Sequence, residues 1–206
     1  RSFVSVNLAF GSAYHRTLES VALTRKEGGT PVSQDAQDLF RDVWARQLND
    51  EKDVRLEKDK SADDYGNEGA GLVAAYLESI DPEEELLAVN EAFCLPMIDS
   101  EGCALEKPLV GEFDCRVRKG DDEVIVDWKT SARRWPKGQA DKSLQPVAYA
   151  YAGKQLFGRN LPVRFDVVVK NKAPITEQHT TRRNDDQFSR MIELVKVVEQ
   201  MVAAEH

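Results

Sequence analysis

The sequence predicts a mixed α/β fold in which helices flank a central β-sheet. Apolar residues recur at helical spacing up to about residue 82, and the alternation typical of strands begins only after that point. The second half then reads as three strands, a helix, two strands and a closing helix. We therefore expect a single domain of residues 1–206, with a helical N-terminal part at 1–82 and a sheet core with flanking helices at 83–206.

Three helices are expected in the N-terminal part. The first covers residues 11–26, and the second begins near Ser33, a residue that can cap a helix. The third covers residues 67–80 and stops at Asp81-Pro82, because a proline disfavours helical backbone in the residue before it. The highly charged stretch 50–66 lacks a clear period, so it is expected to be a loop or a ragged helix end.

The sheet core begins with a strand inside residues 86–98, on which Glu91 shares an alternating face with apolar residues. Strands at 110–117 and 123–127 are expected to pair as a hairpin, because Gly120 and its polar neighbours can form the turn between them. The remaining expected elements are a helix at 142–156, strands at 163–170 and 175–181, and an amphipathic helix at 185–204.

Composition restricts the classes of protein that fit. Three cysteines without C-x-x-C spacing argue against a disulfide framework and a zinc knuckle, and favour reduced thiols in the cytoplasm. No apolar run reaches the roughly 18 residues that a membrane span needs, and the chain opens without the apolar stretch of a signal peptide. The net charge of −8 argues against a broadly basic nucleic-acid-binding surface.

A local basic region nevertheless stands out in this acidic chain. Its cations are either a focused nucleic-acid groove or a solvated charged face, and composition alone does not choose between the two. They are Arg116, Arg118, Lys119, Lys129, Arg133, Arg134 and Lys137.

The segment VIVDWKTS, residues 124–131, places two opposite charges at the end of an apolar strand. Side chains two residues apart in a strand point to the same face, so Asp127 and Lys129 project together and Trp128 packs on the other side. The same acid-x-lysine pattern occurs at residues 50–52, where the polar surroundings indicate surface charge. Context, and not the triplet itself, makes Asp127 and Lys129 the candidates.

Asp114 lies on the preceding strand, between Phe113 and Cys115, which are expected on the opposite face. If the hairpin forms, Asp114 lies across from the Asp127 end of its partner, at the roughly 5–8 Å typical of cross-strand neighbours. Two carboxylates this close repel unless a cation joins them, and Mg²⁺ prefers such oxygen ligands. The alternative is a charged surface hairpin. Gly111 is expected to leave room for the site.

Four short motifs in this order make the sequence resemble the RecB-like branch of the PD-(D/E)XK nuclease superfamily. That branch carries G-x-x-x-H on a helix, G-x-x-D on a strand, D-x-K-T after an apolar run, and Q-x-x-x-Y on a helix. The corresponding residues here are Gly11 and His15, Gly111 and Asp114, Asp127 with Lys129 and Thr130, and Gln145 and Tyr149.

The resemblance implies a restriction-endonuclease-like core and a metal-dependent DNA nuclease, most simply an exonuclease. By this likeness Asp114, Asp127, His15 and the backbone carbonyl of Trp128 would hold Mg²⁺, for which Mn²⁺ could substitute. Lys129 would position the attacking water and offset charge in the transition state. Glu91 would either bind a second metal or form a structural salt bridge. The residues implied for DNA contact or for bracing the site are Gln145, Tyr149, Thr130, Arg133 and Arg134.

Many relatives of this branch hold an iron–sulfur cluster on four cysteines, one before the histidine helix and three after the last helix. Cys94, Cys103 and Cys115 occupy none of those places, so no cluster is expected in this chain. The partners implied are DNA, as single strands or ends, and a helicase or other recombination protein, without a membrane. Two other readings remain: a nuclease-like module that grips DNA ends or a partner without cutting, and a structural domain with solvated charges.

Overall fold

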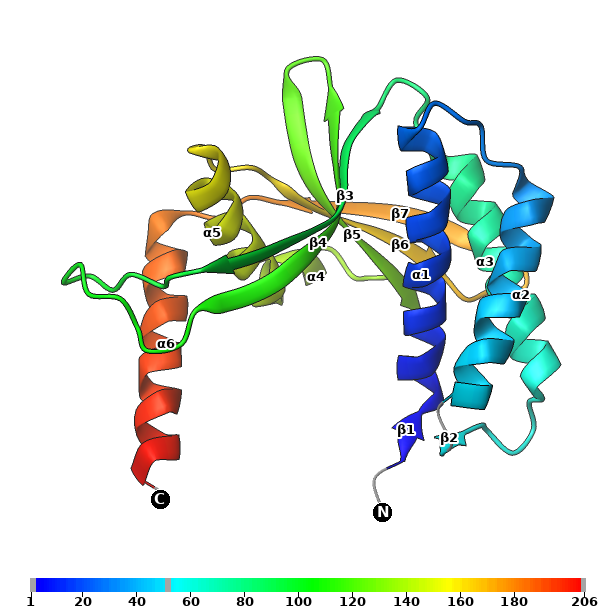
Figure 1. The fold of residues 1–206 in the computed structure, drawn as a ribbon, viewed down its shortest axis with the longest axis horizontal. Helices are drawn as coiled ribbons and strands as arrows, with labels where there is room; N and C mark the ends of the chain where they lie inside the picture. The colour runs from blue at the N-terminus through cyan, green and yellow to red at the C-terminus, as the bar shows by residue number, and fades with distance from the viewer. Residues whose placement is uncertain (1–2, 51–52, 205–206) are drawn as a thin grey trace.

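A computed structural model describes residues 3–50 and 53–204 of the chain (Figure 1). Its helices are α1 (Val6–Lys26), α2 (Ser33–Asp50), α3 (Ala62–Ser79), α4 (Gln139–Lys142), α5 (Gln145–Phe157) and α6 (Asp185–Ala204). Its strands are β1 (Val4–Ser5), β2 (Val54–Arg55), β3 (Glu85–Leu95), β4 (Leu109–Lys119), β5 (Asp122–Ser131), β6 (Val163–Val169) and β7 (Ile175–Thr181).

The central sheet has five strands in the order β3-β4-β5-β6-β7. Neighbouring strands are antiparallel except β5 and β6, which run parallel with α4 and α5 in the connection between them. A helical crossover is the usual way to join parallel neighbours, because the chain must return to the starting edge of the sheet. The mixed α/β fold expected from the sequence is therefore confirmed, as is the hairpin of β4 and β5.

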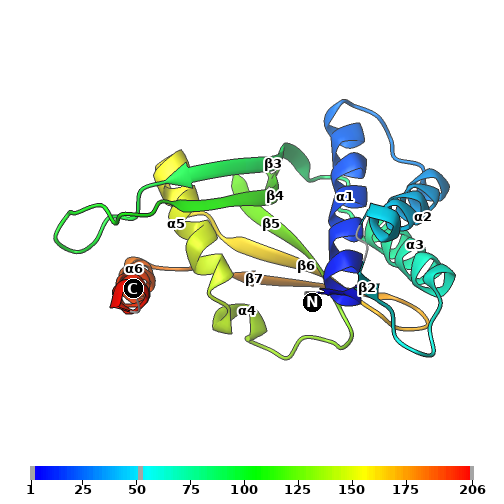
Figure 2. The same ribbon diagram turned by 60° about the horizontal axis from the view of Figure 1, so that its bottom comes forward.

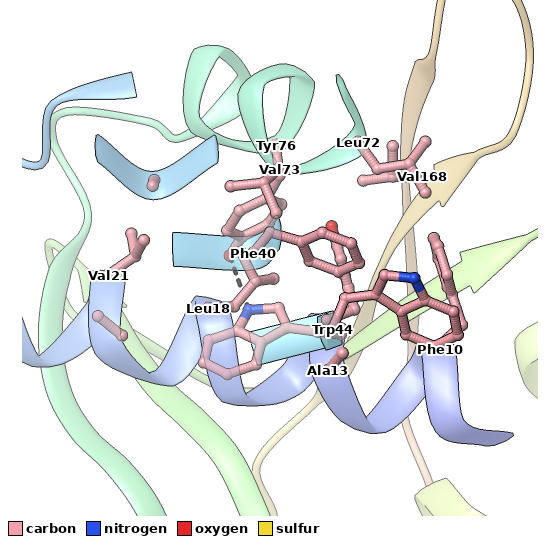
Figure 3. Close-up of a cluster of buried hydrophobic side chains, with 14 of the residues drawn as sticks. Phe10, Ala13, Leu18, Val21, Phe40, Trp44, Leu72, Val73, Tyr76 and Val168 are labelled. Atoms are coloured by element: carbon pink, nitrogen blue, oxygen red, sulfur yellow. Dashed lines mark hydrogen bonds between the residues drawn. The ribbon is translucent and has the colours of Figure 1, made fainter. Parts of the chain in front are cut away.

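Two layers of helices cover different parts of the sheet. Figure 1 shows α1, α2 and α3 on the right and α5 and α6 on the left, and Figure 2 shows the same separation with α6 seen end-on. On the first side, buried residues of α1–α3 pack against buried residues of β4, β5 and β6 (Figure 3). This cluster includes Phe10, Phe40 and Trp44 from the helices and Val168 from β6. On the other side, α5 and α6 pack with a second group that includes Phe113 and Ile125.

Two helices of the N-terminal part begin earlier than expected, whereas α2 begins at Ser33 as the sequence predicts. Helix α1 starts at Val6 and not at residue 11, because Val6, Ala9 and Phe10 already contribute to the buried cluster. Helix α3 starts at Ala62 and not at residue 67, because Ser61 and Asp64 form reciprocal hydrogen bonds that satisfy its first backbone N–H groups.

The charged stretch 50–66 also contains regular structure that the sequence did not predict. Strand β2 lies in this stretch and pairs in parallel with β1. The first residues of α3, from Ala62 on, also belong to this stretch. Glu51 and Lys52 of the acid-x-lysine triplet at 50–52 lie outside the described residues, so no structural account of them follows.

Two element boundaries near the basic region differ from the expectation. Strand β5 continues to Ser131 and does not end at Asp127, because β6 pairs with it along residues 125–131. The helix expected at 142–156 is present as α5 but begins at Gln145, and Ser143, with an extended backbone, separates it from the short helix α4. Asp127 and Lys129 therefore lie inside a strand and not beyond its end.

Candidate active site

The candidate site forms where β4 separates from β5. The ladder between these strands covers Cys115–Lys119 of β4 and stops before Asp114. Asp114 instead accepts a hydrogen bond at Oδ2 from the backbone N–H of Trp128 (2.7 Å), and its Oδ1 lies 3.2 Å from His15 Nδ1 on α1. Asp114 thereby links α1, β4 and β5 at one point.

Asp127 is 1% exposed and faces the α5 side of the sheet. Its Oδ2 lies 2.5 Å from Lys129 Nζ, and Gln145 Nε2 donates a hydrogen bond to its Oδ1 (2.6 Å). The Lys129 contact is an ion pair without good hydrogen-bond geometry, so within the described residues Oδ2 has no hydrogen-bond partner. Lys129 therefore compensates the charge of this buried oxygen without donating a well-aligned hydrogen bond to it.

Burial and neighbouring charge perturb both ionisable groups beside Asp114. Burial raises the pKa of the Asp127 carboxyl, an effect that the Lys129 charge opposes and the Asp114 charge reinforces. Burial of His15 works against its protonation, but the hydrogen bond and charge of Asp114 outweigh burial and raise the pKa of the imidazole. Groups perturbed by burial and by a specific partner are concentrated at functional sites in proteins.

Gln145 and Tyr149 lie one turn apart on α5 and meet at this site. Gln145 Nε2 also donates to the Tyr149 hydroxyl (3.0 Å), and the Tyr149 ring packs edge-on against Phe113, with ring centroids 5.3 Å apart. Burial, together with the charges of Asp127 and Asp114, holds the pKa of Tyr149 well above its ordinary value. The phenol therefore stays neutral and keeps its proton for donation.

Trp128 packs on the face opposite Asp127, as the strand alternation predicts. Its ring is buried against α1–α3, and its Nε1 donates to the hydroxyl of Tyr76 on α3 (2.7 Å). Tyr76 thus fixes the residue whose backbone N–H holds Asp114. No local pattern indicates this contact, because residues 76 and 128 belong to elements far apart in the chain.

Two expectations about the neighbours of Asp114 are wrong. Gly111 does not make room for the site: a side chain there would meet the Phe93 ring at 2.5 Å, so this glycine accommodates Phe93. Phe113 and Cys115 do not share a face, since Phe113 packs with α5 and Cys115 packs with α1–α3. The ladder from β4 to β5 ends between these two residues.

The remaining candidates lie apart from the carboxylates. Glu91 forms an ion pair with Arg116 (Oε2 to Nε, 3.0 Å), which matches the salt-bridge alternative. Thr130 is half-buried on β5, and Arg133 is exposed in the loop that follows. Arg134 is exposed and pairs with Glu177 on β7.

The donor set at the site suits a divalent metal ion in kind: two carboxylates, an imidazole and a buried Oδ2 without a hydrogen-bond partner. In the described part of the chain, however, only Asp99, Glu101 and Cys103 bring three such donor atoms within 4.8 Å of one another. In that loop Asp99 is already bound by Lys196 (2.9 Å). In this structure the donor atoms of His15, Asp114 and Asp127 therefore do not all lie within 4.8 Å of one another.

The sequence profile described as "PD-(D/E)XK nuclease superfamily" matches residues 3–205. No curated protein sequence matches the chain. Among solved structures, the chain is similar to the "Putative exonuclease" from Eubacterium rectale, with 12% identity and a TM-score of 0.42, covering 98% of this chain and 80% of that one. It is also similar to SSO0001, with 11% identity and a TM-score of 0.39, covering 98% and 77%. No helix in the described ranges is long and apolar enough to cross a membrane.

Proposed function

Because the chain belongs to the PD-(D/E)XK nuclease superfamily, we propose that it is a metal-dependent nuclease that hydrolyses phosphodiester bonds in DNA, acting as an exonuclease. One observation carries the proposal: His15 from α1, Asp114 from β4 and the pair Asp127 and Lys129 from β5 meet where β4 leaves β5. The buried, perturbed Asp127 is difficult to explain as a structural charge, because a hydrophobic residue there would cost less.

Asp114, Asp127, His15 and the Trp128 carbonyl would hold the ion, Mg²⁺ or Mn²⁺, and Glu91 is left to its salt bridge with Arg116. Such an ion, when bound, lowers the pKa of a coordinated water and accepts charge from a phosphate oxygen.

Side chains and one backbone group of the protein would position the substrate and the attacking water. Lys129 would place its ammonium beside the reacting phosphate, as its position next to Asp127 supports. Gln145, once released from Asp127, and the neutral Tyr149 hydroxyl would donate hydrogen bonds to the substrate or the attacking water. The Trp128 N–H keeps Asp114 in place throughout.

End-labelled DNA digestion with Mg²⁺ or Mn²⁺ tests the proposal. Lys129→Ala should reduce cleavage by on the order of 10²–10³, the usual loss for one electrostatic contact in the transition state. Lys107→Ala, in the exposed loop between β3 and β4, is the matched control and should cleave like the wild type. Cleavage by Lys129→Ala at the wild-type rate, in a protein with an unchanged melting temperature, would overturn the assignment.

A second candidate is a nuclease-like module that binds DNA ends or a partner without cutting them. It is favoured by one observation, the Lys129 and Gln145 contacts that hold Asp127 away from a ligand position. The same digestion decides between the two, because this module would bind labelled DNA and leave it intact in the presence of either metal.

The wider setting that we propose follows from the family resemblance alone. Residues 1–206 would form one nuclease domain acting in the cytoplasm on DNA ends or single strands. Its work would lie in DNA repair, recombination or the processing of phage or mobile-element DNA, with a helicase as a possible type of partner. Thr130, Arg133 and Arg134 would contribute to the DNA contact.

A further inference from the structure

Strands β3 and β4 exchange the faces of their side chains at the same point of their ladder. On β3, Val89 packs with the cluster of α1–α3, and Phe93 packs with the cluster of α5 and α6. On β4, Cys115 packs with the first cluster and Phe113 with the second. In a regular strand, side chains two or four residues apart share a face, so both strands depart from regular alternation between these residues.

The exchange occurs where Asn90 of β3 lies across from Asp114 of β4. The ladder pairs on either side of this position are Val89 with Cys115 and Glu91 with Phe113. Each strand therefore has a single residue between the two pairs, and neither strand has an inserted residue here. Because a bulge needs such an insertion, the exchange of faces at this point arises from backbone conformation.

Asn90 has the backbone conformation that such an exchange requires. Its φ is 48°, and within residues 3–50 and 53–204 it is the only residue other than glycine with a positive φ. This left-handed conformation lies far from that of a strand and is costly for most L-amino acids, whereas asparagine adopts it more readily. Backbone outliers of this kind are concentrated at functional sites, where the fold holds a reactive group in place.

The consequence for the candidate site lies on the other side of β4. The ladder between β4 and β5 ends with the pair of Cys115 and Val126. Two residues further along β5, the backbone N–H of Trp128 donates to Oδ2 of Asp114 (2.7 Å). The Asp114 carboxylate thus takes the place of a backbone acceptor from β4, and its other oxygen reaches His15 (3.2 Å).

We propose that Asn90 is a positioning residue for Asp114: its left-handed backbone separates β4 from β5 at this point and directs the Asp114 carboxylate to the Trp128 N–H and to His15. The inference rests on the proposed function and adds to it a residue that touches neither the substrate nor the ion. Glycine adopts a positive φ freely, so it should replace Asn90 without loss. A β-branched residue favours extended backbone and should not replace it.

Hydrogen exchange of two backbone amides on β5, followed by NMR in EDTA, measures the placement of Asp114. The Trp128 amide donates to Asp114, whereas the Ile125 amide donates to the Pro162 carbonyl (3.0 Å), away from β4. Asn90→Val should speed exchange of the Trp128 amide about tenfold, the factor that corresponds to the usual cost of a left-handed L-residue. It should leave the Ile125 amide unchanged, and Asn90→Gly should leave both amides as in the wild type.

Ala92→Val is the matched control, because Ala92 is exposed on the same strand and forms a regular ladder pair with Glu112. It should change neither amide. Unchanged exchange at Trp128 in Asn90→Val, or an equal increase at Trp128 and Ile125, would overturn the inference, since a general loss of stability speeds both amides. Should Asn90→Val fail to fold, Asn90→Ala, which lacks the branched side chain, is held to the same outcomes.

The exchange measurement is independent of cleavage, so this inference and the nuclease assignment can fail separately. In an active enzyme, Asn90→Val should lower kcat by about tenfold to a hundredfold with KM for DNA unchanged, because a small displacement of a reacting group has effects of this size. Asn90→Gly should cleave like the wild type. Faster exchange at Trp128 alone, in a protein that never cleaves DNA, would support the role of Asn90 and defeat the nuclease proposal. Wild-type kcat in Asn90→Val would overturn the positioning role.

Discussion

Asp127 combines deep burial with a charge that Lys129 and Gln145 only partly compensate. We expect Asp127→Asn to stabilise the metal-free protein near pH 7 by about 1 kcal/mol, because the charged carboxylate is disfavoured in the fold. Lys129, 30% exposed, can turn toward water once its partner is neutral. Denaturant unfolding in EDTA measures the change.

The same variant tests whether an ion uses this carboxylate. Mg²⁺ should raise the melting temperature of the wild type, since a ligand that binds only the folded state stabilises it, and it should leave Asp127→Asn nearly unaffected. An equal Mg²⁺-induced rise in both proteins would place the ion elsewhere.

Asp166 on β6 supplies a pH dependence that lies outside the carboxylates proposed for the ion. Burial raises the pKa of the Asp166 carboxyl to about 6, well above its ordinary value, although Arg164 pairs with it (2.7 Å). The folded protein therefore binds this proton more tightly than the unfolded chain does. The stabilising effect is complete below about pH 4 and is lost as the pH rises through about 6.

As the pH rises from 4 to 6, we accordingly expect the free energy of unfolding of Asp166→Asn to increase relative to that of the wild type, by up to about 3 kcal/mol. Asparagine keeps one oxygen for the Arg164 Nε hydrogen bond but loses the acceptor for Arg164 Nη2, so the charge effect is given by how the stability difference varies with pH and not by its absolute size. Urea unfolding of both proteins across this range is the measurement. A difference in stability that does not vary with pH would contradict the assignment.

Helix α3 offers two glycines whose surroundings differ sharply. A methyl group at Gly71 would meet no atom within 4 Å, whereas one at Gly69 would lie 2.0 Å from the Phe40 ring. Gly71→Ala should therefore stabilise the protein by about 0.5–1 kcal/mol through helix propensity alone. Gly69→Ala, with the same gain in propensity, should destabilise it by about 1–3 kcal/mol through overpacking. Thermal melts of the pair measure both, and equal shifts would mean that α2 and α3 pack more loosely than described.

At the same scale, the sequence predicted elements better than their ends. The apolar periods of α2 and of the hairpin strands are local signals, so those elements could be found. The first turns of α1 and α3 could not be found from period alone, although the Ser61 and Asp64 pair of α3 was a usable signal. The extension of β5 to Ser131 depends on pairing with β6, which is distant in sequence.

One buried cluster joins α1, α2 and α3 to three strands of the sheet. Trp44 of α2 and Trp128 of β5 both belong to it, so the helical N-terminal part and the sheet core should unfold as a unit. We expect thermal unfolding followed by tryptophan fluorescence and by far-ultraviolet circular dichroism to give coincident transitions. Loss of helical signal ahead of the fluorescence change would contradict this.

The candidate site follows the same division between local and long-range information. Strand alternation was enough to place Asp127 and Lys129 on one face and Trp128 on the other. The Tyr76 contact to Trp128 and the Glu177 contacts to Arg134 and Trp135 join residues that are 42 or more positions apart in the chain, so no local pattern predicts them. Glu177 and His179 alternate on a predicted strand, but only the register of β7 with β6 and β5 places them in line with Lys129 and Asp127.

The hydrogen bond between Trp128 and Tyr76 has a consequence for how this protein can diverge. Position 128 would serve an ion through a backbone carbonyl, which any amino acid provides, so chemistry does not constrain its side chain. The helical layer does, because the indole is buried and bonded to Tyr76. Among descendants of this gene, positions 76 and 128 should change together, in step with repacking of α3, while Asp127 and Lys129 stay fixed. An evolutionary lineage could thus replace the helices around the site and retain the reaction, at the cost of a paired substitution.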